Sequence, residues 1–189
     1  KANGAKDPAL FQTLANIHVS KFEYDAAIKA LEEGLKANPN HRYLTYDYIN
    51  LLLDSEKYSN AKLAIENTLK IDDKNKLLYF LYGYLEQHSG NTDRAELSYQ
   101  KALELDETYF DALYQLGLTY IIGANKHLTN PNSNSQLFTS FLNRSEFVLN
   151  QAYEINPNDR PTIQLLIDIN TRKNRLDKVQ ELRSKLEEF

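Results

Sequence analysis

The sequence predicts an all-α protein built from a repeated helical unit, and two observations lead to this prediction. The first is a 34-residue period that relates columns of small or apolar residues. The columns are Ala27, Ala61 and Ala95, then Leu35, Leu69 and Leu103, and the pair Gly83 and Gly117. The second is that turn-forming segments at 37–40, 71–74 and 105–108 stand in phase with this period.

The small residues and the turns each have a physical role in this prediction. We expect Gly83 and Gly117 where the first helix of a pair crosses the second, because a Cβ there would push the two helices apart. Glycine inside a helix costs about 1 kcal/mol relative to alanine, so close packing must compensate. Pro39 and the acidic turns are expected to end the second helices, since proline cannot continue a helix.

A 34-residue period with these residues resembles the tetratricopeptide repeat, a pair of antiparallel helices. The matching positions are a large residue at position 4 (Phe11, Tyr79, Leu113), a pair at positions 7–8 (Leu14-Ala15, Tyr82-Gly83, Leu116-Gly117) and the alanines at position 20. The second unit departs from the pattern, with Thr45 at position 4 and Tyr48-Ile49 at the pair. The resemblance implies a right-handed superhelix, or α-solenoid, of about five antiparallel helix pairs in a single domain over residues 1–189.

The period divides the chain into units 8–41, 42–75, 76–109, 110–159 and 160–189. Pro39 and Pro157 stand in nearly identical Asn-Pro-Asn turns, and their spacing exceeds three whole periods. From the remainder we expect a 16-residue insertion in the fourth unit, near 122–137, that lengthens both helices by about two turns around a loop at 129–136.

A disordered loop on an otherwise normal fourth unit is the alternative. The long hairpin is favoured because Phe138 and Phe141 would otherwise be exposed. Unit 160–189 is expected to be the C-terminal cap, since Leu176, Val179, Leu182 and Leu186 alternate with charged residues and leave a solvated outer face.

Composition and motifs exclude several classes of function. The chain has 22 Lys and Arg against 26 Asp and Glu, and a net charge of -4 argues against a nucleic-acid partner. Cysteine is absent, and no apolar run is long enough to predict a membrane span. None of the four histidines has metal-ligand spacing, and packing is the favoured role of His18. Phosphate-binding and nucleophile-elbow motifs are missing, so we predict no cofactor, no metal site and no enzyme.

The resemblance implies that the first helix of each pair lines a concave face through positions 2, 5, 6, 9, 12 and 13. The candidate peptide-binding residues at these positions are Gln12, Asn16, Tyr43, Tyr46, Asp47, Asn50, Phe80, Tyr84 and Tyr114, and Asp54 holds a further such position. Tyrosine offers contact area at low entropy cost, and amide or carboxylate groups can bind a peptide backbone. Packing of the tyrosines against neighbouring first helices is the alternative.

Relatives that bind chaperone tails hold the terminal carboxylate with lysine and arginine at these positions. Gln12 replaces the lysine here, and Leu77 and Leu81 stand where the other basic residues are required. We therefore expect no carboxylate clamp for chaperone tails in this chain.

The predicted function is a non-catalytic scaffold that binds a peptide or protein segment on a tyrosine-rich concave face. The alternatives are a structural or self-associating array, with homo-oligomers formed through the insertion hairpin, and the recognition part of a larger envelope protein. Residues 76–189 resemble the C-terminal half of tetratricopeptide proteins common in Bacteroidetes. This narrower resemblance implies export to the periplasm or cell envelope, with the cytoplasm as the alternative location.

Overall fold

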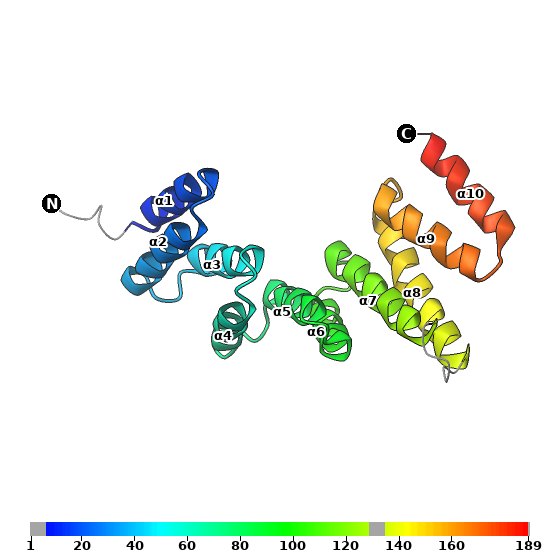
Figure 1. The fold of residues 1–189 in the computed structure, drawn as a ribbon, viewed down its shortest axis with the longest axis horizontal. Helices are drawn as coiled ribbons and strands as arrows, with labels where there is room; N and C mark the ends of the chain where they lie inside the picture. The colour runs from blue at the N-terminus through cyan, green and yellow to red at the C-terminus, as the bar shows by residue number, and fades with distance from the viewer. Residues whose placement is uncertain (1–6, 129–134, 189) are drawn as a thin grey trace. The chain divides into compact units, whose positions relative to one another are not determined.

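The computed structural model describes residues 7–128 and 135–188, and all regular elements in these ranges are α-helices. The helices are α1 (Pro8–Ser20), α2 (Tyr24–Ala37), α3 (Arg42–Asp54), α4 (Tyr58–Leu69), α5 (Lys76–His88), α6 (Thr92–Leu105), α7 (Phe110–Leu128), α8 (Ser135–Ile155), α9 (Arg160–Arg172) and α10 (Leu176–Glu187). Each odd-numbered helix packs against the even-numbered helix that follows it (Figure 1). The predicted all-α class with five helix pairs is confirmed.

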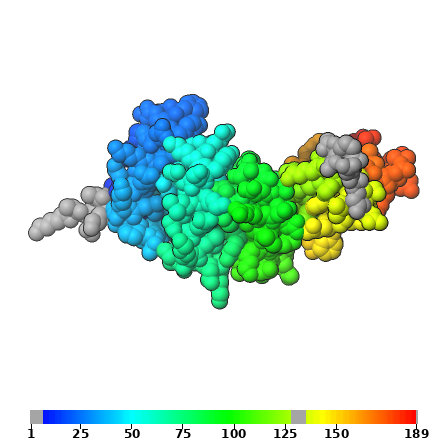
Figure 2. Space-filling model, turned by 60° about the horizontal axis from the view of Figure 1, so that its bottom comes forward, coloured from blue at the N-terminus to red at the C-terminus, as the bar shows by residue number. Residues whose placement is uncertain are grey.

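The chain divides into two compact units. Unit 1 ends at Lys74 and contains α1 to α4, and unit 2 begins at Asn75 and contains α5 to α10. On the face drawn in Figure 2, side chains fill the spaces between the helices of each unit. The assignment of the whole chain to one domain stays a prediction.

The predicted small residues lie at close helix crossings. A Cβ added to Gly83 on α5 would lie 2.6 Å from the ring of Tyr99 on α6. A Cβ added to Gly117 on α7 would likewise lie 2.6 Å from Leu149 on α8. The prediction that a Cβ at these positions would push the helices apart is therefore confirmed, and the atoms it would meet belong to a large side chain of the second helix.

The turns inside the helix pairs repeat a left-handed backbone conformation with the predicted period. Phe22, Glu56 and Gly90 have φ of 61°, 56° and 79° and follow one another at intervals of one period. Asn174 has φ of 55° and lies beyond Gly90 by two periods plus the length of the predicted insertion. In each turn the next residue donates its N–H to a carbonyl five residues back, as Asn91 does to Glu86 at 2.8 Å. This bond satisfies a carbonyl at the end of the first helix.

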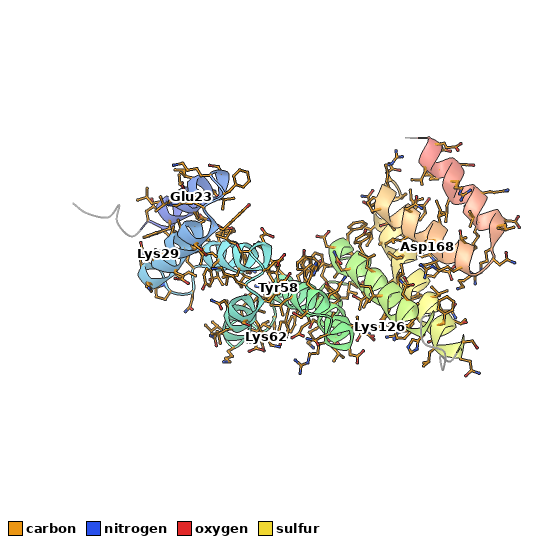
Figure 3. All side chains as sticks on the ribbon, viewed as in Figure 1. Glu23, Lys29, Tyr58, Lys62, Lys126 and Asp168 are labelled. Atoms are coloured by element: carbon orange, nitrogen blue, oxygen red, sulfur yellow. The ribbon has the colours of Figure 1, made fainter. Side chains whose placement is uncertain are left out.

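The first of these turns also carries a side-chain contact. Nδ1 of His18 lies 2.6 Å from Oε2 of Glu23, which Figure 3 labels beside the start of α2. The side chain of His18 is 26% exposed. The ring is thus half-buried, and it binds a carboxylate across the turn in addition to packing.

The second pair accommodates its unusual residues by burial and one hydrogen bond. Ile49 is fully buried, and Thr45 is 8% exposed. The hydroxyl of Tyr48 donates to Oε1 of Glu32 on α2 at 3.0 Å. Tyr48, a large residue at the position of the usual small pair, therefore finds a partner on the preceding helix.

The fourth pair is elongated, as predicted. Helices α7 and α8 have 19 and 21 residues, whereas the other helices have 12 to 14. Phe138 and Phe141 of α8 are half-buried against the cluster that contains Ile121 and Leu142. Ala124, which stands where a left-handed turn residue would fall without the insertion, is fully buried within α7. Most of the predicted loop, 129–134, lies outside the described residues.

The last helix pair of unit 2, α9 and α10, has a buried apolar face and several ion pairs near the turn between its helices. Ile163 and Ile169 of α9 are fully buried, and Val179 of α10 packs against Ile163. Leu176, which was predicted on the same apolar face, is instead 62% exposed. Glu146 of α8 accepts hydrogen bonds from Lys173 and Arg175 in the turn between α9 and α10, and Asp168 pairs with Arg172 at 2.9 Å.

Substitutions at equivalent turn positions should have opposite effects. Phe22→Asn should stabilise unit 1 by about 0.5–1 kcal/mol, because Phe22 is 79% exposed and asparagine tolerates its positive φ better. Gly90→Ala should destabilise unit 2 by about 1 kcal/mol for the converse reason. Urea unfolding followed by circular dichroism measures both changes, and a shift of the same sign in the two variants would contradict the prediction.

The tyrosine titration should show a late component from Tyr48. Burial, followed by the hydrogen bond to Glu32, raises the pKa of Tyr48 to about 12. Because the unfolded pKa is about 10, the folded state holds this proton more tightly, and stability is lost as pH rises from about 10 to 12. Tyr48→Phe should remove one late-titrating group from the ultraviolet absorbance curve. If the variant loses only a tyrosine that titrates near pH 10, the assignment is wrong.

Candidate functional site

The first helices of unit 1, α1 and α3, contact each other along one side of the unit. The carboxylate of Asp7 caps α1 by accepting the N–H of Ala9 at 3.0 Å. The His41 ring caps α3 by accepting the N–H of Leu44 at 3.3 Å. These caps fix where each helix begins, and side chains three or four residues apart then share one helix face.

A hollow of about 200 Å³ opens between these helices, and we call it the α1–α3 hollow. Its lining comprises Gln12, Ala15, Asn16, Val19, Leu31, Asp47, Asn50, Leu51 and Asp54. Nε2 of Gln12 donates to Oδ2 of Asp47 at 2.5 Å, which joins the two helices. The structure therefore brings together Gln12, Asn16, Asp47 and Asn50 from the predicted set, while their role in binding stays a prediction.

The α1–α3 hollow combines an apolar floor with a polar rim. Ala15, Leu31 and Leu51 in the floor are 3%, 2% and 7% exposed. The rim carries three carboxamides and two carboxylates, those of Asp47 and Asp54, and the lining contains no lysine, arginine or histidine. A ligand would therefore meet an apolar surface and oxygen acceptors, with carboxamide N–H groups as the side-chain donors.

The two tyrosines predicted on α3 lie outside this hollow. Tyr43 is 67% exposed, and its ring centroid lies 6.2 Å from that of His41. The hydroxyl of Tyr46 accepts a hydrogen bond from Nε of Arg42 at 2.7 Å, and this bond raises the pKa of Arg42. Tyr46 lines a second hollow in unit 1, together with Thr68 and other residues of the 40–46 and 68–72 segments.

The three predicted aromatic residues of unit 2 have packing partners within that unit. Phe80 is a partly buried member of a core cluster, with its ring centroid 5.9 Å from Tyr99 and 5.4 Å from Tyr109. The ring of Tyr84 lies 4.0 Å from that of His88. Tyr114 packs against the cluster around Ile121, and burial raises its pKa.

Sequence positions identified the rim of the hollow but missed its floor. Leu31 comes from α2, so a survey of groove positions on first helices could not include it. Its place four residues after the buried Ala27 marks it as a core residue and not as a ligand contact. The rim could be predicted because its residues hold groove positions that the tetratricopeptide resemblance implies, and helical spacing then puts Asp47, Asn50 and Asp54 on one face of α3.

The described part of the chain offers neither a group of three metal ligands nor a membrane-spanning helix. Within 7–128 and 135–188, no three His, Asp or Glu residues lie close enough to form a metal-binding group. None of the helices in this described part of the chain combines the length and apolar character needed to cross a bilayer.

The fold and the placement of the hollow on paired first helices define the chain as a helical-repeat protein. A family model described as tetratricopeptide repeat matches residues 8–41 and 78–109. These two segments are therefore tetratricopeptide repeats, and the fold matches that of solved helical-repeat solenoids. This fold fits protein–protein interaction and is typically a non-catalytic scaffold.

Solved structures share this fold at low sequence identity. MamA from Desulfovibrio magneticus, residue 41 to its end, is 16% identical with a TM-score of 0.74, over 96% of this chain and 93% of that chain. A tetratricopeptide repeat protein from Parabacteroides merdae is 16% identical with a TM-score of 0.73, over 96% and 66%. YrrB, described as a TPR protein with an unusual peptide-binding site, is 20% identical with a TM-score of 0.63, over 95% and 84%. Among curated proteins, no sequence matches this chain.

Removing the charge of Asp54 should stabilise the free protein. Asp54 is the last residue of α3, and the last turn of this helix has no basic residue. The negative end of the helix dipole disfavours a carboxylate there, so Asp54→Asn should raise the free energy of unfolding by about 0.3–1 kcal/mol at low salt. Urea unfolding tests this, with Asp73→Asn in the exposed turn after α4 as the control. Equal effects in the two variants would show that net charge, and not the helix end, is responsible.

Proposed function

We propose that this protein is a non-catalytic scaffold that binds an extended segment of a partner protein across the α1–α3 hollow of unit 1. The observation that carries the proposal is the convergence of Gln12, Asn16, Asp47 and Asn50 around one hollow. Residues 35 positions apart in the sequence, Gln12 and Asp47, are joined there by a hydrogen bond.

The chemistry of the rim suits a peptide backbone. A carboxamide offers both N–H donors and an oxygen acceptor, so Asn16 and Asn50 can bind the carbonyl and N–H groups of an extended chain. Both residues are exposed at the rim. Because every peptide segment carries these groups, such contacts supply affinity without requiring a particular sequence.

The charge of the rim favours some partners over others. Chaperone-tail recognition requires basic side chains, and the lining of the hollow contains two carboxylates and no basic residue. An anionic tail would therefore be repelled. The net charge of -4 supports a protein partner in preference to a nucleic acid.

The tyrosines take different parts in this proposal. Tyr43 is 67% exposed on α3 and supplies a contact beside the hollow. Phe80 and Tyr114 serve the packing of unit 2, as their contacts with the core clusters indicate. The binding face that we propose is therefore more polar than a tyrosine-rich surface.

Two related proposals concern the setting of the protein. YrrB is described as having a peptide-binding site, which supports peptide binding as a role for this fold. Export to the periplasm or cell envelope of a bacterium is proposed from the resemblance of residues 76–189 to exported tetratricopeptide proteins. The cytoplasm is the competing location, and self-association through α7 and α8 is the competing role.

The proposal predicts that the amides of the rim contribute to peptide affinity. Peptides selected on the protein from a random phage-displayed library would be synthesised with a fluorescent label, and their Kd measured by anisotropy. The double variant Asn16→Ala, Asn50→Ala should bind about tenfold more weakly, because each lost hydrogen bond is worth about 0.5–1.5 kcal/mol. Asn60→Ala on α4, an exposed residue outside the hollow, is the matched control and should bind within about twofold of the parent.

The same experiment can contradict the proposed function. Selection of no peptide at all, or equal affinity of the double variant and the Asn60→Ala control, would contradict the proposal. Circular dichroism of each variant shows that the helices are intact, so a loss of binding reports on the rim and not on folding.

A further inference from the structure

We infer that the α1–α3 hollow is a pocket for one cationic side chain, a lysine or arginine of the bound segment. This inference rests on the proposed function and deepens it by naming the chemistry of the partner. It stands on the shape of the hollow, the distribution of charge around it and the helix end that borders it.

The shape of the hollow suits a long side chain with an apolar stem. Its floor is formed by Ala15, Leu31 and Leu51, which are almost fully buried, with Val19 partly buried beside them. A space of about 200 Å³ has room for one side chain and is too small for a secondary-structure element. Lysine and arginine bury their methylene stems against such a surface while the charged head stays at the polar edge.

The rim supplies acceptors for a cationic head. Asp47 and Asp54 contribute carboxylates, and hydrogen bonds between a cation and a carboxylate are about twice as strong as neutral ones. The bond from Gln12 holds the carboxylate of Asp47 in place through one oxygen, and a carboxylate accepts several hydrogen bonds at once. The acceptor is thus oriented before the ligand arrives, which reduces the entropy lost on binding.

The C-terminal end of α3, which borders the hollow, also favours a cationic side chain. Asp54 closes α3, and the carbonyl groups of the last turn carry partial negative charge. No basic residue in that turn offsets this charge. A cation placed in the hollow would therefore interact favourably with the helix end as well as with the two carboxylates.

Other ligands fit this arrangement less well. A divalent metal ion needs more charged ligands than the hollow offers, since the described residues contain no metal-binding group of three His, Asp or Glu. An acidic side chain would face two like charges. A neutral aliphatic side chain would fill the floor but leave both carboxylates facing a partner that provides no donor.

Single amino-acid probes test the pocket without knowledge of the natural partner. The probes are Nα-acetyl-lysine N-methylamide and Nα-acetyl-arginine N-methylamide, and their uncharged counterparts are the norleucine and citrulline derivatives. Each is titrated into the ¹⁵N-labelled full chain at low salt, and amide chemical shifts are followed. The cationic probes should bind at millimolar Kd and perturb residues 12–19 and 47–55, whereas the uncharged probes should bind at least about fivefold more weakly.

Isosteric variants separate the charges of the pocket from the charge of the whole protein. Asp47→Asn and Asp54→Asn should each weaken the lysine probe by about fivefold or more, and the asparagine at 47 still accepts the hydrogen bond from Gln12. Asp73→Asn removes the same charge from an exposed turn outside the hollow and should leave binding unchanged. Binding should also weaken as salt is raised.

Each outcome decides the inference. Preference for the cationic probes that is lost at positions 47 and 54 supports it. Equal binding of norleucine and lysine, equal loss in all three variants, or no shift with the lysine probe would overturn it. The proposed function fails separately, when random-peptide selection yields no ligand or when selected ligands ignore Asn16 and Asn50. Selected peptides that lack lysine and arginine would overturn the inference while leaving peptide binding intact.

Discussion

The tight crossing between the two helices of a pair is the contact on which the rest of this fold depends. At Gly83 and Gly117 an added Cβ would lie 2.6 Å from the facing side chain of the second helix. Because Tyr99 and Leu149 occupy that space, the two helices are held at one register, and a slip by one residue would bring a side chain into the crossing. Fixed registers within the pairs determine which residues of a first helix face outward, and the rim of the hollow of unit 1 is built from such residues.

The features of the fold that are marked by particular residue types at particular positions could be predicted from the sequence. The 34-residue period follows from columns of small and apolar residues. The spacing of Pro39 and Pro157, which end helices, then reveals the 16-residue insertion. The left-handed turn residues could not be predicted equally well. Gly90 and Asn174 are types that favour a positive φ, whereas Phe22 and Glu56 adopt it because the helices on either side require it.

The candidate site, like the fold, could be predicted only in part. Gln12, Asn16, Asp47 and Asn50 were predicted because they hold the groove positions that the tetratricopeptide resemblance implies, and the structure places them around one hollow of unit 1. Tyr46 directly precedes Asp47, yet it bonds Arg42 and lines a different hollow, because adjacent helix residues point about 100° apart. Phe80 holds a groove position but packs on Tyr99 and Tyr109. Large aromatic side chains reach whatever apolar surface lies near them, so position alone does not decide between binding and packing.

The exposure of the rim carboxylates would let the proposed cation preference of the hollow cost the free protein little stability. Asp47 and Asp54 are solvated and lie about two turns apart on α3, and even charges about 4 Å apart in water interact by only about 1 kcal/mol, so the unliganded protein tolerates the pair at little cost. A bound segment displaces this water and lowers the local dielectric constant, which strengthens every electrostatic interaction beneath it. A cationic side chain would then form charge-assisted bonds, whereas a neutral one would desolvate the carboxylates and offer them no donor of its own. Discrimination arises mainly from the penalty imposed on the wrong partner, and it appears only when the segment is bound.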